Sequence, residues 1–258
     1  MISDPSPSAE AALLSWPDLC ERLRAGAPAI LSVGSFEQHG PHLPMATDAI
    51  IVERLADELA GRLGAVRLPT LPYGAPSRPR SGGGDVFPAP AVTLEGLIGT
   101  LRAIVGGIVE TGARSLVVLS WHMENAAVLW DALRAPMHGS DARALLFEAP
   151  WDYLPQELID ELFPEGTALW PADHAGRLET AVMLHLAPEL VGEPPAPVTF
   201  HARTRYDVLP TPRDAVPETG VVLDCAPASR ELGRRCWEAM VAGVAKDATS
   251  ELSPRPPA

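Results

Sequence analysis

Cysteine is scarce in the sequence, and its spacing excludes two common uses of the thiol. The three cysteines are Cys20, Cys225 and Cys236. An odd number at these spacings fits neither a disulfide framework nor the closely paired cysteines of a structural zinc site. We therefore expect three ordinary reduced thiols.

Positive charge is also in short supply. The 20 Lys and Arg residues face 33 Asp and Glu residues, which gives a formal net charge of -13 at pH 7 without a long run of like charges. This balance argues against nucleic acid as a partner and against binding to an anionic membrane surface. The expected partner is a small molecule.

Long hydrophobic runs are missing as well. The first stretch, MISDPSPSAE, has neither the basic region nor the apolar region of a signal peptide. No later apolar run approaches the ~18 residues that a membrane span needs. These features predict a cytoplasmic protein that does not enter a membrane.

Apolar residues are nevertheless abundant, and their spacing alternates between strand and helix patterns. Of 258 residues, 47% are hydrophobic, which suits one sizeable core. The expected strands lie near residues 28–35, 65–71, 114–120 and 142–149, and the expected helices begin near Ser15, Thr47, Thr93, Asn125, His174 and residue 229. Such alternation predicts an α/β fold: a three-layer α/β/α sandwich with a mostly parallel central sheet.

Metal-type ligands follow two of these expected strands. Glu37, His39 and Asp48 come after the first strand, and His122 and Glu124 come directly after the third. Ligands of an open parallel sheet bind beyond the carboxyl ends of its strands. Imidazole nitrogens and carboxylate oxygens are the mixture that zinc and manganese accept. A single His or Glu at a strand end is usually an ordinary surface residue. Only the two groups of residues taken together, one after each strand, indicate a metal site.

The spacing of these residues predicts two ions. Residues i and i+2 of an extended segment point to the same side, so each strand end can present two ligands to one pocket. Five ligands exceed the need of one catalytic zinc, whereas two ions about 3.5 to 4 Å apart can share a carboxylate. Asp48 is the natural bridge. His42 falls outside the i, i+2 pairing and is left out of the ligand set.

Three further sites are ambiguous from their residue types. The glycine run at 81–85 lacks the Lys-Ser/Thr pair of a phosphate loop, and it fits either a ligand-contacting loop or a flexible surface loop. Trp170 and His174 fit either a stacking wall with an acid/base, or a core aromatic with a histidine at a helix start. Trp151, after the fourth strand, is equally open.

Four segments together resemble the creatininase (creatinine amidohydrolase) family. They are VGSFEQHGPHLPMATD, LPYGAPSRPRSGGGDVFP, SWHMEN and DHAGRLETA, in the family's order and near its spacing. The HMEN stretch is similar to the H-x-E-N form of creatininase proper. The resemblance implies one creatininase-like metallohydrolase domain over residues 1–258, with flexible ends at about 1–10 and 252–258. It also implies a homohexamer built as a trimer of dimers.

The resemblance implies a site that holds zinc and manganese. One ion would be bound by Glu37, Asp48 and His122, and the other by His39, Asp48 and Glu124. The implied substrate-contacting residues are Ser81, Met123, Trp151, Trp170 and His174. His174 and Glu124 would be the catalytic residues, and two tryptophans would sandwich a flat ring.

Three departures from the family pattern surround this implied site. Met123 stands where creatininase has tyrosine, Pro171 stands where it has aspartate, and Ser120-Trp121 replaces an Asn-Gly pair. The first two changes remove polar groups that could pair with an amidine-like ring. The metal ligands are intact, so hydrolysis is a firmer expectation than creatinine as the substrate.

These features predict a metal-dependent amidohydrolase that opens a small cyclic amide such as creatinine. An alternative is a creatininase-like hydrolase of a linear amide, either an N-formyl compound or a small peptide. A third hypothesis, of a different functional class, is a non-catalytic binding protein that keeps metal for stability.

Overall fold

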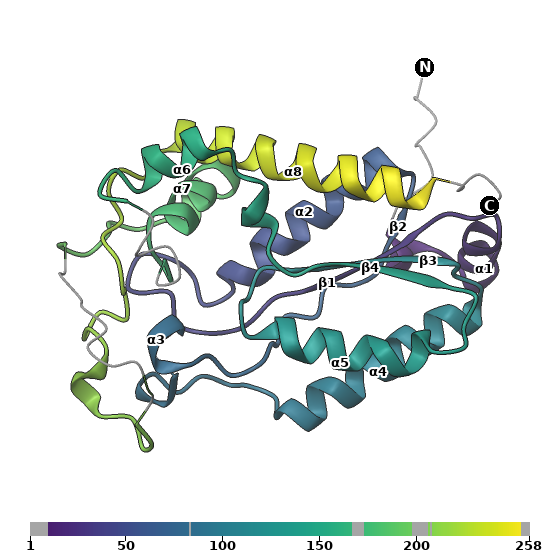
Figure 1. Cartoon of the computed structure of the whole chain (residues 1–258), viewed down its shortest axis with the longest axis horizontal. Coiled ribbons are helices and arrows are strands. Elements are labelled where there is room, and N and C mark those ends of the chain that lie inside the picture. Colours follow the sequence, from purple (N-terminus) through teal and green to yellow (C-terminus); the bar gives the residue numbers. More distant parts are fainter. Residues whose placement is uncertain (1–9, 83, 167–172, 198–205, 207, 254–258) are drawn as a thin grey trace.

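A parallel sheet of four strands lies at the centre of the computed structural model (Figure 1). The structure describes residues 10–82, 84–166, 173–197, 206 and 208–253, so most of the predicted flexible ends lies outside it. The strands are β1 (Ala29–Val33), β2 (Val66–Arg67), β3 (Ser115–Ser120) and β4 (Arg143–Phe147), in the spatial order β2-β1-β3-β4. The predicted parallel sheet is confirmed.

Strands β1 and β3 are direct neighbours, and their register positions the site. Ala29 pairs with Leu116 at one end, and Val33 pairs with Ser120 at the other. The carboxyl ends of the two strands are therefore level. The segments that follow Val33 and Ser120 leave the sheet side by side.

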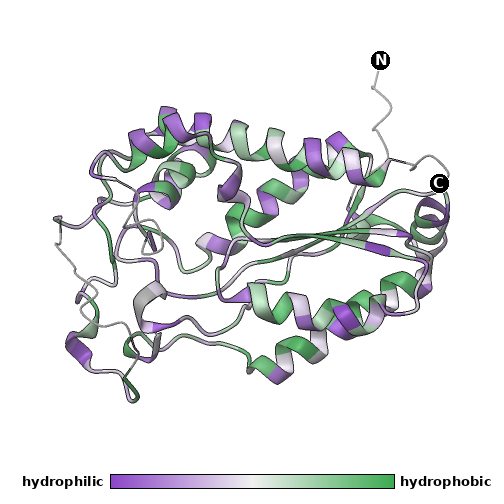
Figure 2. Cartoon of the chain, viewed as in Figure 1, coloured by the Kyte–Doolittle hydropathy of each residue, from purple (hydrophilic) through white to green (hydrophobic). Residues whose placement is uncertain are grey.

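Helices cover both faces of the sheet and complete the predicted three layers (Figure 1). One layer contains α2 (Thr47–Leu63), α7 (Arg177–Leu186) and α8 (Arg230–Leu252), and the other contains α1 (Trp16–Arg24), α4 (Leu94–Thr111) and α5 (Asn125–Met137). Successive strand residues enter opposite cores: Ile30 faces the α2 layer and Leu31 faces the α4 layer. This explains why the strands are almost continuously hydrophobic (Figure 2).

Among the expected helix starts, Ser15 and Thr93 act as caps and Thr47 does not. Ser15 and Thr93 cap α1 and α4 by accepting hydrogen bonds from the backbone N–H groups of Asp18 and Gly96. Thr47 was expected to cap its helix but is the first residue inside α2, because its hydroxyl donates to the carbonyl of Pro44 at 2.6 Å.

Two shorter helices, α3 (Pro79–Gly82) and α6 (Gln156–Leu162), lie in the connections. No helix among the described residues is both long and apolar enough to cross a membrane.

The second strand is shorter than predicted. Only Val66 and Arg67 of the expected 65–71 segment form β2, although Leu71 still donates its N–H to Ser32 of β1 at 2.9 Å. Pro69 interrupts the ladder because it has no N–H to donate.

Helices α7 and α8 approach each other very closely. A Cβ atom added at Gly233 of α8 would lie 1.8 Å from the carbonyl oxygen of Ala181 in α7. Only glycine allows this approach. The contact fixes α7, which carries a carboxylate of the site described below.

Candidate metal centre

The predicted ligands of the two strand ends meet in one buried cluster. Glu37 and His39 lie in the loop after β1, Asp48 lies in the first turn of α2, and His122 follows β3. The side chains of all four are nearly inaccessible, with Glu37 the most exposed at 7%. Burying several ionisable groups together is costly unless something compensates their charges.

Asp48 lies between the two imidazole rings and points one oxygen at each. Its Oδ1 is 3.3 Å from Nε2 of His39, and its Oδ2 is 3.4 Å from Nδ1 of His122. A carboxylate shared by two histidines in this manner has the geometry of a bridge between two ligand sets.

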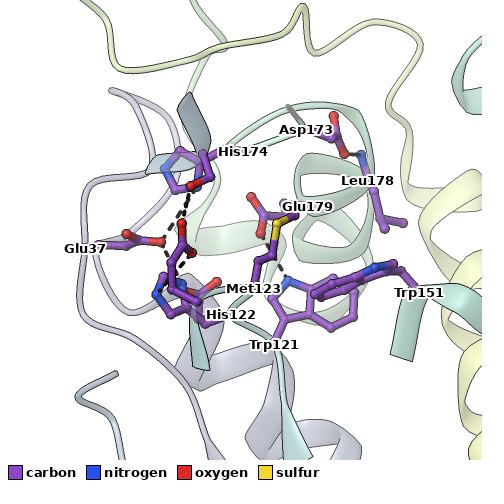
Figure 3. A pocket seen from close by; sticks show the side chains of 12 residues that line it. Glu37, Trp121, His122, Met123, Trp151, Asp173, His174, Leu178 and Glu179 are labelled. Atoms are coloured by element: carbon purple, nitrogen blue, oxygen red, sulfur yellow. Dashed lines mark hydrogen bonds and ion pairs between the residues drawn. The ribbon is translucent and has the colours of Figure 1, made fainter. Parts of the chain in front are cut away.

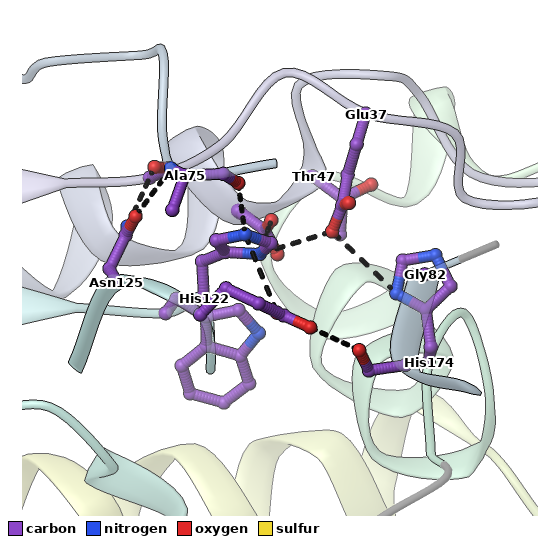
Figure 4. A network of polar contacts seen from close by, with 12 residues as sticks. Glu37, Thr47, Ala75, Gly82, His122, Asn125 and His174 are labelled. Atoms are coloured by element: carbon purple, nitrogen blue, oxygen red, sulfur yellow. Dashed lines mark hydrogen bonds and ion pairs between the residues drawn. The ribbon is translucent and has the colours of Figure 1, made fainter. Parts of the chain in front are cut away.

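The first set consists of Glu37, Asp48 and His122, whose ligand atoms lie within 4.8 Å of one another. Oε1 of Glu37 is 3.1 Å from Nδ1 of His122 (Figure 4). These are the three residues expected to hold one ion.

The second set consists of His39, Asp48 and Glu179, whose ligand atoms also lie within 4.8 Å of one another. Oε2 of Glu179 is 3.7 Å from Nε2 of His39. Glu179, from the first turn of α7, therefore lies where Glu124 was expected, beside His39 and Asp48. His174 also lies close enough to Glu37 and His39 to form a third group.

Backbone carbonyls fix which nitrogen each ring presents to the carboxylates. Nε2 of His122 is 2.8 Å from the carbonyl oxygen of Ala75, and Nδ1 of His39 is 3.3 Å from that of Glu37. A carbonyl only accepts, so both of these nitrogens carry the proton. When the ring is neutral, its opposite nitrogen is the lone-pair donor, and this nitrogen faces the carboxylates. This outer hydrogen bond is the usual support of a metal-ligating histidine.

Three ligand atoms in the cluster are buried without a hydrogen-bond partner in the described part of the chain. They are Oε2 of Glu37, Nε2 of His39 and Oδ2 of Asp48. Buried polar atoms normally have a hydrogen-bond partner, so three ligand atoms without one need an explanation. Divalent cations would satisfy all three, and the residues present therefore fit a centre of two metal ions.

The metal-free cluster compensates its charge by keeping protons on its histidines. Burial lowers the pKa of His39, but Asp48 and Glu179 outweigh it and hold that pKa well above its usual value. The pKa of His122 is likewise raised against burial by Glu37 and Asp48. Burial raises the pKa of Glu37, yet His122 and His174 bring it below its ordinary value.

We therefore expect metal binding to release protons, because a cation needs the unprotonated ring. The apparent affinity for Mn²⁺ should rise with pH until the pH passes the pKa values of His39 and His122, which lie above the ordinary histidine value of about 6.5. The raised histidine pKa values also imply that the metal-free protein loses stability as the pH rises through them. Calorimetric titration in buffers of different ionisation enthalpy measures the protons released; none released, with an affinity independent of pH, would contradict the expectation.

Glu124 lies at the edge of the cluster and is held by other partners. Its Oε1 accepts hydrogen bonds from the hydroxyl of Ser81 and, at 3.1 Å, from the backbone N–H of Arg78. Its Oε2 is 3.5 Å from Nε2 of His122. The roles of Glu124 as ligand and catalytic residue, and of Ser81 as a substrate contact, stay predictions.

A pocket opens beside the cluster, and predicted substrate contacts line it (Figure 3). Met123, which is 48% exposed, lies at its mouth. Trp151 forms part of its wall, from the short 3-10 helix Pro150–Tyr153 after β4. Trp170 and Pro171 lie outside the described residues.

His174 reaches the pocket from the segment before α7. Its Nε2 donates to the carbonyl of Gln38 at 2.7 Å, because a carbonyl can only accept. Nδ1, 3.7 Å from Oε1 of Glu37, is then the ring nitrogen left to exchange a proton with a bound molecule. The next residue upstream, Asp173, accepts the backbone N–H groups of Arg177 and Leu178 and so ties this segment to α7.

Comparison with known proteins gives the context of this centre. The family model described as "Creatininase: Creatinine amidohydrolase" matches residues 12–247. The chain belongs to the creatininase family. The resemblance seen in the sequence is thereby confirmed for the family, and the protein is a creatininase-family hydrolase.

Two relatives with different named substrates are similar to this chain. A creatinine amidohydrolase of Pseudomonas putida is 33% identical over 256 residues, covering 93% of this chain and 96% of the relative. A mycofactocin precursor peptide peptidase of Mycobacterium tuberculosis (strain CDC 1551 / Oshkosh) is 30% identical over 220 residues, covering 82% of this chain and 80% of the relative. Their names differ in substrate, so membership of the creatininase family does not fix the substrate here.

A solved structure named "Creatininase Mn" has the same fold. It superposes with a TM-score of 0.88 at 31% identity, over 96% of this chain and all of that one (100%). The predicted creatininase-like α/β/α fold is confirmed.

Glu179 and Asn125 are residues of this creatininase-family site that sequence reasoning missed. Glu179 is an acidic residue in the first turn of α7, and its neighbours Leu178 and Thr180 are also buried. An acidic residue among buried neighbours is a weak indication of a functional site. Asn125 joins three loops: its amide donates to the carbonyl of Gly34 at 3.0 Å, and its oxygen accepts from the N–H of Ala75 at 2.8 Å (Figure 4). Only the folded chain reveals that role.

His42, which was left out of the ligand set, lies in the core behind the centre. Its Nε2 is 3.0 Å from the hydroxyl of Thr180. It belongs to none of the ligand groups found among the described residues.

Proposed function

We propose that this protein is a two-metal amidohydrolase that opens a small cyclic amide, creatinine or a related ring. The observation that carries the proposal is the position of Asp48, with one carboxylate oxygen directed at each of two histidines. Membership of the creatininase family supports the reaction class, and the pocket beside the cluster supports a small substrate.

Glu37, Asp48 and His122 would hold one divalent ion, and His39, Asp48 and Glu179 would hold the other. Ions of this kind, zinc and manganese being the expected pair, supply a nucleophilic water at neutral pH and polarise the amide carbonyl. The protein's contribution is a dry, fixed set of ligands whose ring orientations are set by the carbonyls of Ala75 and Glu37.

The proton needed by the leaving nitrogen would pass through His174. Its Nδ1 is available as a base, since Nε2–H is used on the carbonyl of Gln38. A ring so held can take a proton at Nδ1 and return it at the same atom. Trp151 and Met123 would contact the flat face of the substrate, with Trp170 as the second aromatic wall.

A linear amide is the second candidate substrate, and one position favours it. Met123 replaces the tyrosine of creatininase and is exposed at the pocket mouth, where an apolar, adaptable side chain suits a peptide or N-formyl group. The peptidase relative supports the same reading.

An activity screen tests the proposal and separates the candidates. Purified protein would be loaded with Mn²⁺ or Zn²⁺ and assayed on creatinine, hydantoins, N-formyl compounds and short peptides. We expect hydrolysis of a cyclic amide that a chelator abolishes and added metal restores. Turnover of linear substrates only would overturn the cyclic-amide proposal, and metal-loaded protein that binds a cyclic amide without turnover would indicate a binding protein. Light scattering would test the predicted hexamer.

A further inference from the structure

We propose that Trp121 is a positioning residue that holds Glu179 toward the second metal position and shapes the pocket floor. The inference rests on the proposed two-metal function. Trp121 directly follows β3, is only 2% exposed, and donates its indole N–H to Oε1 of Glu179 at 3.1 Å (Figure 3). Nothing in its spacing suggested a role, because it precedes the His-x-Glu pair.

The Glu179 carboxylate is held by one donor on each oxygen. Trp121 binds Oε1, and the backbone N–H of Ala175 binds Oε2 at 2.7 Å. Ala175 has a φ of 52°, a left-handed conformation that is uncommon for a residue with a side chain. Both donors are neutral and keep their protons at any ordinary pH, so they orient the carboxylate without neutralising it.

This arrangement matters because Glu179 comes from a different element than the other ligands. It lies on α7, whereas His39 and Asp48 belong to the loop after β1 and to α2. A flexible glutamate would lose rotamer freedom on binding a cation. The indole of Trp121 removes that freedom beforehand and links α7 to the end of β3, next to His122.

The ring of Trp121 has a second consequence, for the pocket. It packs edge-on against Trp151, with centroids 5.3 Å apart and planes at 89°, and both rings line the pocket. Trp121 thus fixes the orientation of the Trp151 wall and occupies part of the pocket lining.

The test is Trp121→Phe, which removes the indole N–H and keeps an aromatic ring. We expect the Mn²⁺ site that includes Glu179 to lose ~10- to 100-fold in affinity, the usual effect of removing an outer-sphere partner, while the other site is unchanged. Calorimetry and metal analysis of dialysed protein measure this without any substrate.

Trp237→Phe is the matched control. Trp237 is also 2% exposed and donates its indole N–H to a carboxylate, Glu58 Oε1 at 2.6 Å, but lies in the core away from the metal centre. Trp237→Phe should lower the unfolding temperature and leave both Mn²⁺ affinities unchanged.

A double-mutant cycle shows whether Trp121 acts through Glu179. In a Glu179→Gln background, adding Trp121→Phe should cause no further loss of Mn²⁺ affinity, since the two residues form one unit. Should Trp121→Phe not fold, a benzothiophene analogue of tryptophan at position 121 alone keeps the ring shape and removes the N–H.

The outcomes separate this inference from the proposed function. Wild-type protein that binds fewer than two Mn²⁺ or Zn²⁺ ions defeats the proposed function itself. Wild-type protein that binds two ions, with Trp121→Phe or the benzothiophene analogue binding them equally well, overturns only the role of Trp121.

Discussion

Asp48→Asn is expected to dismantle the metal centre and to reduce kcat/KM by more than ~100-fold, because loss of an outer-sphere partner alone costs up to that factor. Asp48 belongs to both ligand sets and faces a histidine with each oxygen. The amide of asparagine keeps the shape, but it removes the negative charge and replaces one lone-pair oxygen with an N–H₂ donor. Neither ion then has its full set of protein ligands.

Metal analysis by mass spectrometry checks this expectation directly. Wild-type protein should retain two ions per chain, and Asp48→Asn one or none, with a far-ultraviolet spectrum that shows an intact fold. The control is Asp57→Asn in the same helix, which removes a partially exposed ion pair to Arg67 at 2.6 Å. Arg67 keeps its ion pairs to Glu10 and Glu53 in this variant, so Asp57→Asn should keep both ions and full turnover. Full metal content in Asp48→Asn would refute the shared-carboxylate centre.

The part of this centre that the sequence could predict is the part built on neighbouring strands. Glu37, His39 and His122 follow β1 and β3, and in a parallel sheet such positions share one edge. Alternating strand and helix patterns were enough to infer that arrangement. Asp48 could be added because it lies in the first turn of the next helix along the chain.

Glu179 and Trp121 could not be assigned in the same way. Glu179 reaches the centre because α7 packs on α8 through Gly233, a tertiary contact that leaves no periodic signal. Trp121 has its role through Glu179 and Trp151, which lie far from it in the sequence. The early end of β2 has a local cause, the missing N–H of Pro69, and the start of α2 depended on a carbonyl, that of Pro44, whose position only the folded loop defines.

His174→Gln is expected to lower kcat by ~10²- to 10⁴-fold, the range for a group that transfers a proton in the transition state. Glutamine can still donate to the carbonyl of Gln38, so the segment should keep its place, but it cannot take a proton as Nδ1 of His174 can. Both metal ions should remain bound. Added imidazole should restore part of the rate, because the pocket opens to solvent at Met123.

This variant also decides between two uses of His174, since the ring lies within reach of Glu37 and His39. If His174 were a ligand, His174→Gln would lose an ion, and added metal rather than imidazole would restore activity. A changed metal content would therefore contradict the proton-transfer role. His138→Gln is the control: His138 is exposed at the C-terminal end of α5, the end away from His122, and its replacement should change neither metal content nor kcat. A fall in kcat at constant metal content, confined to His174→Gln, follows only if the ring moves a proton.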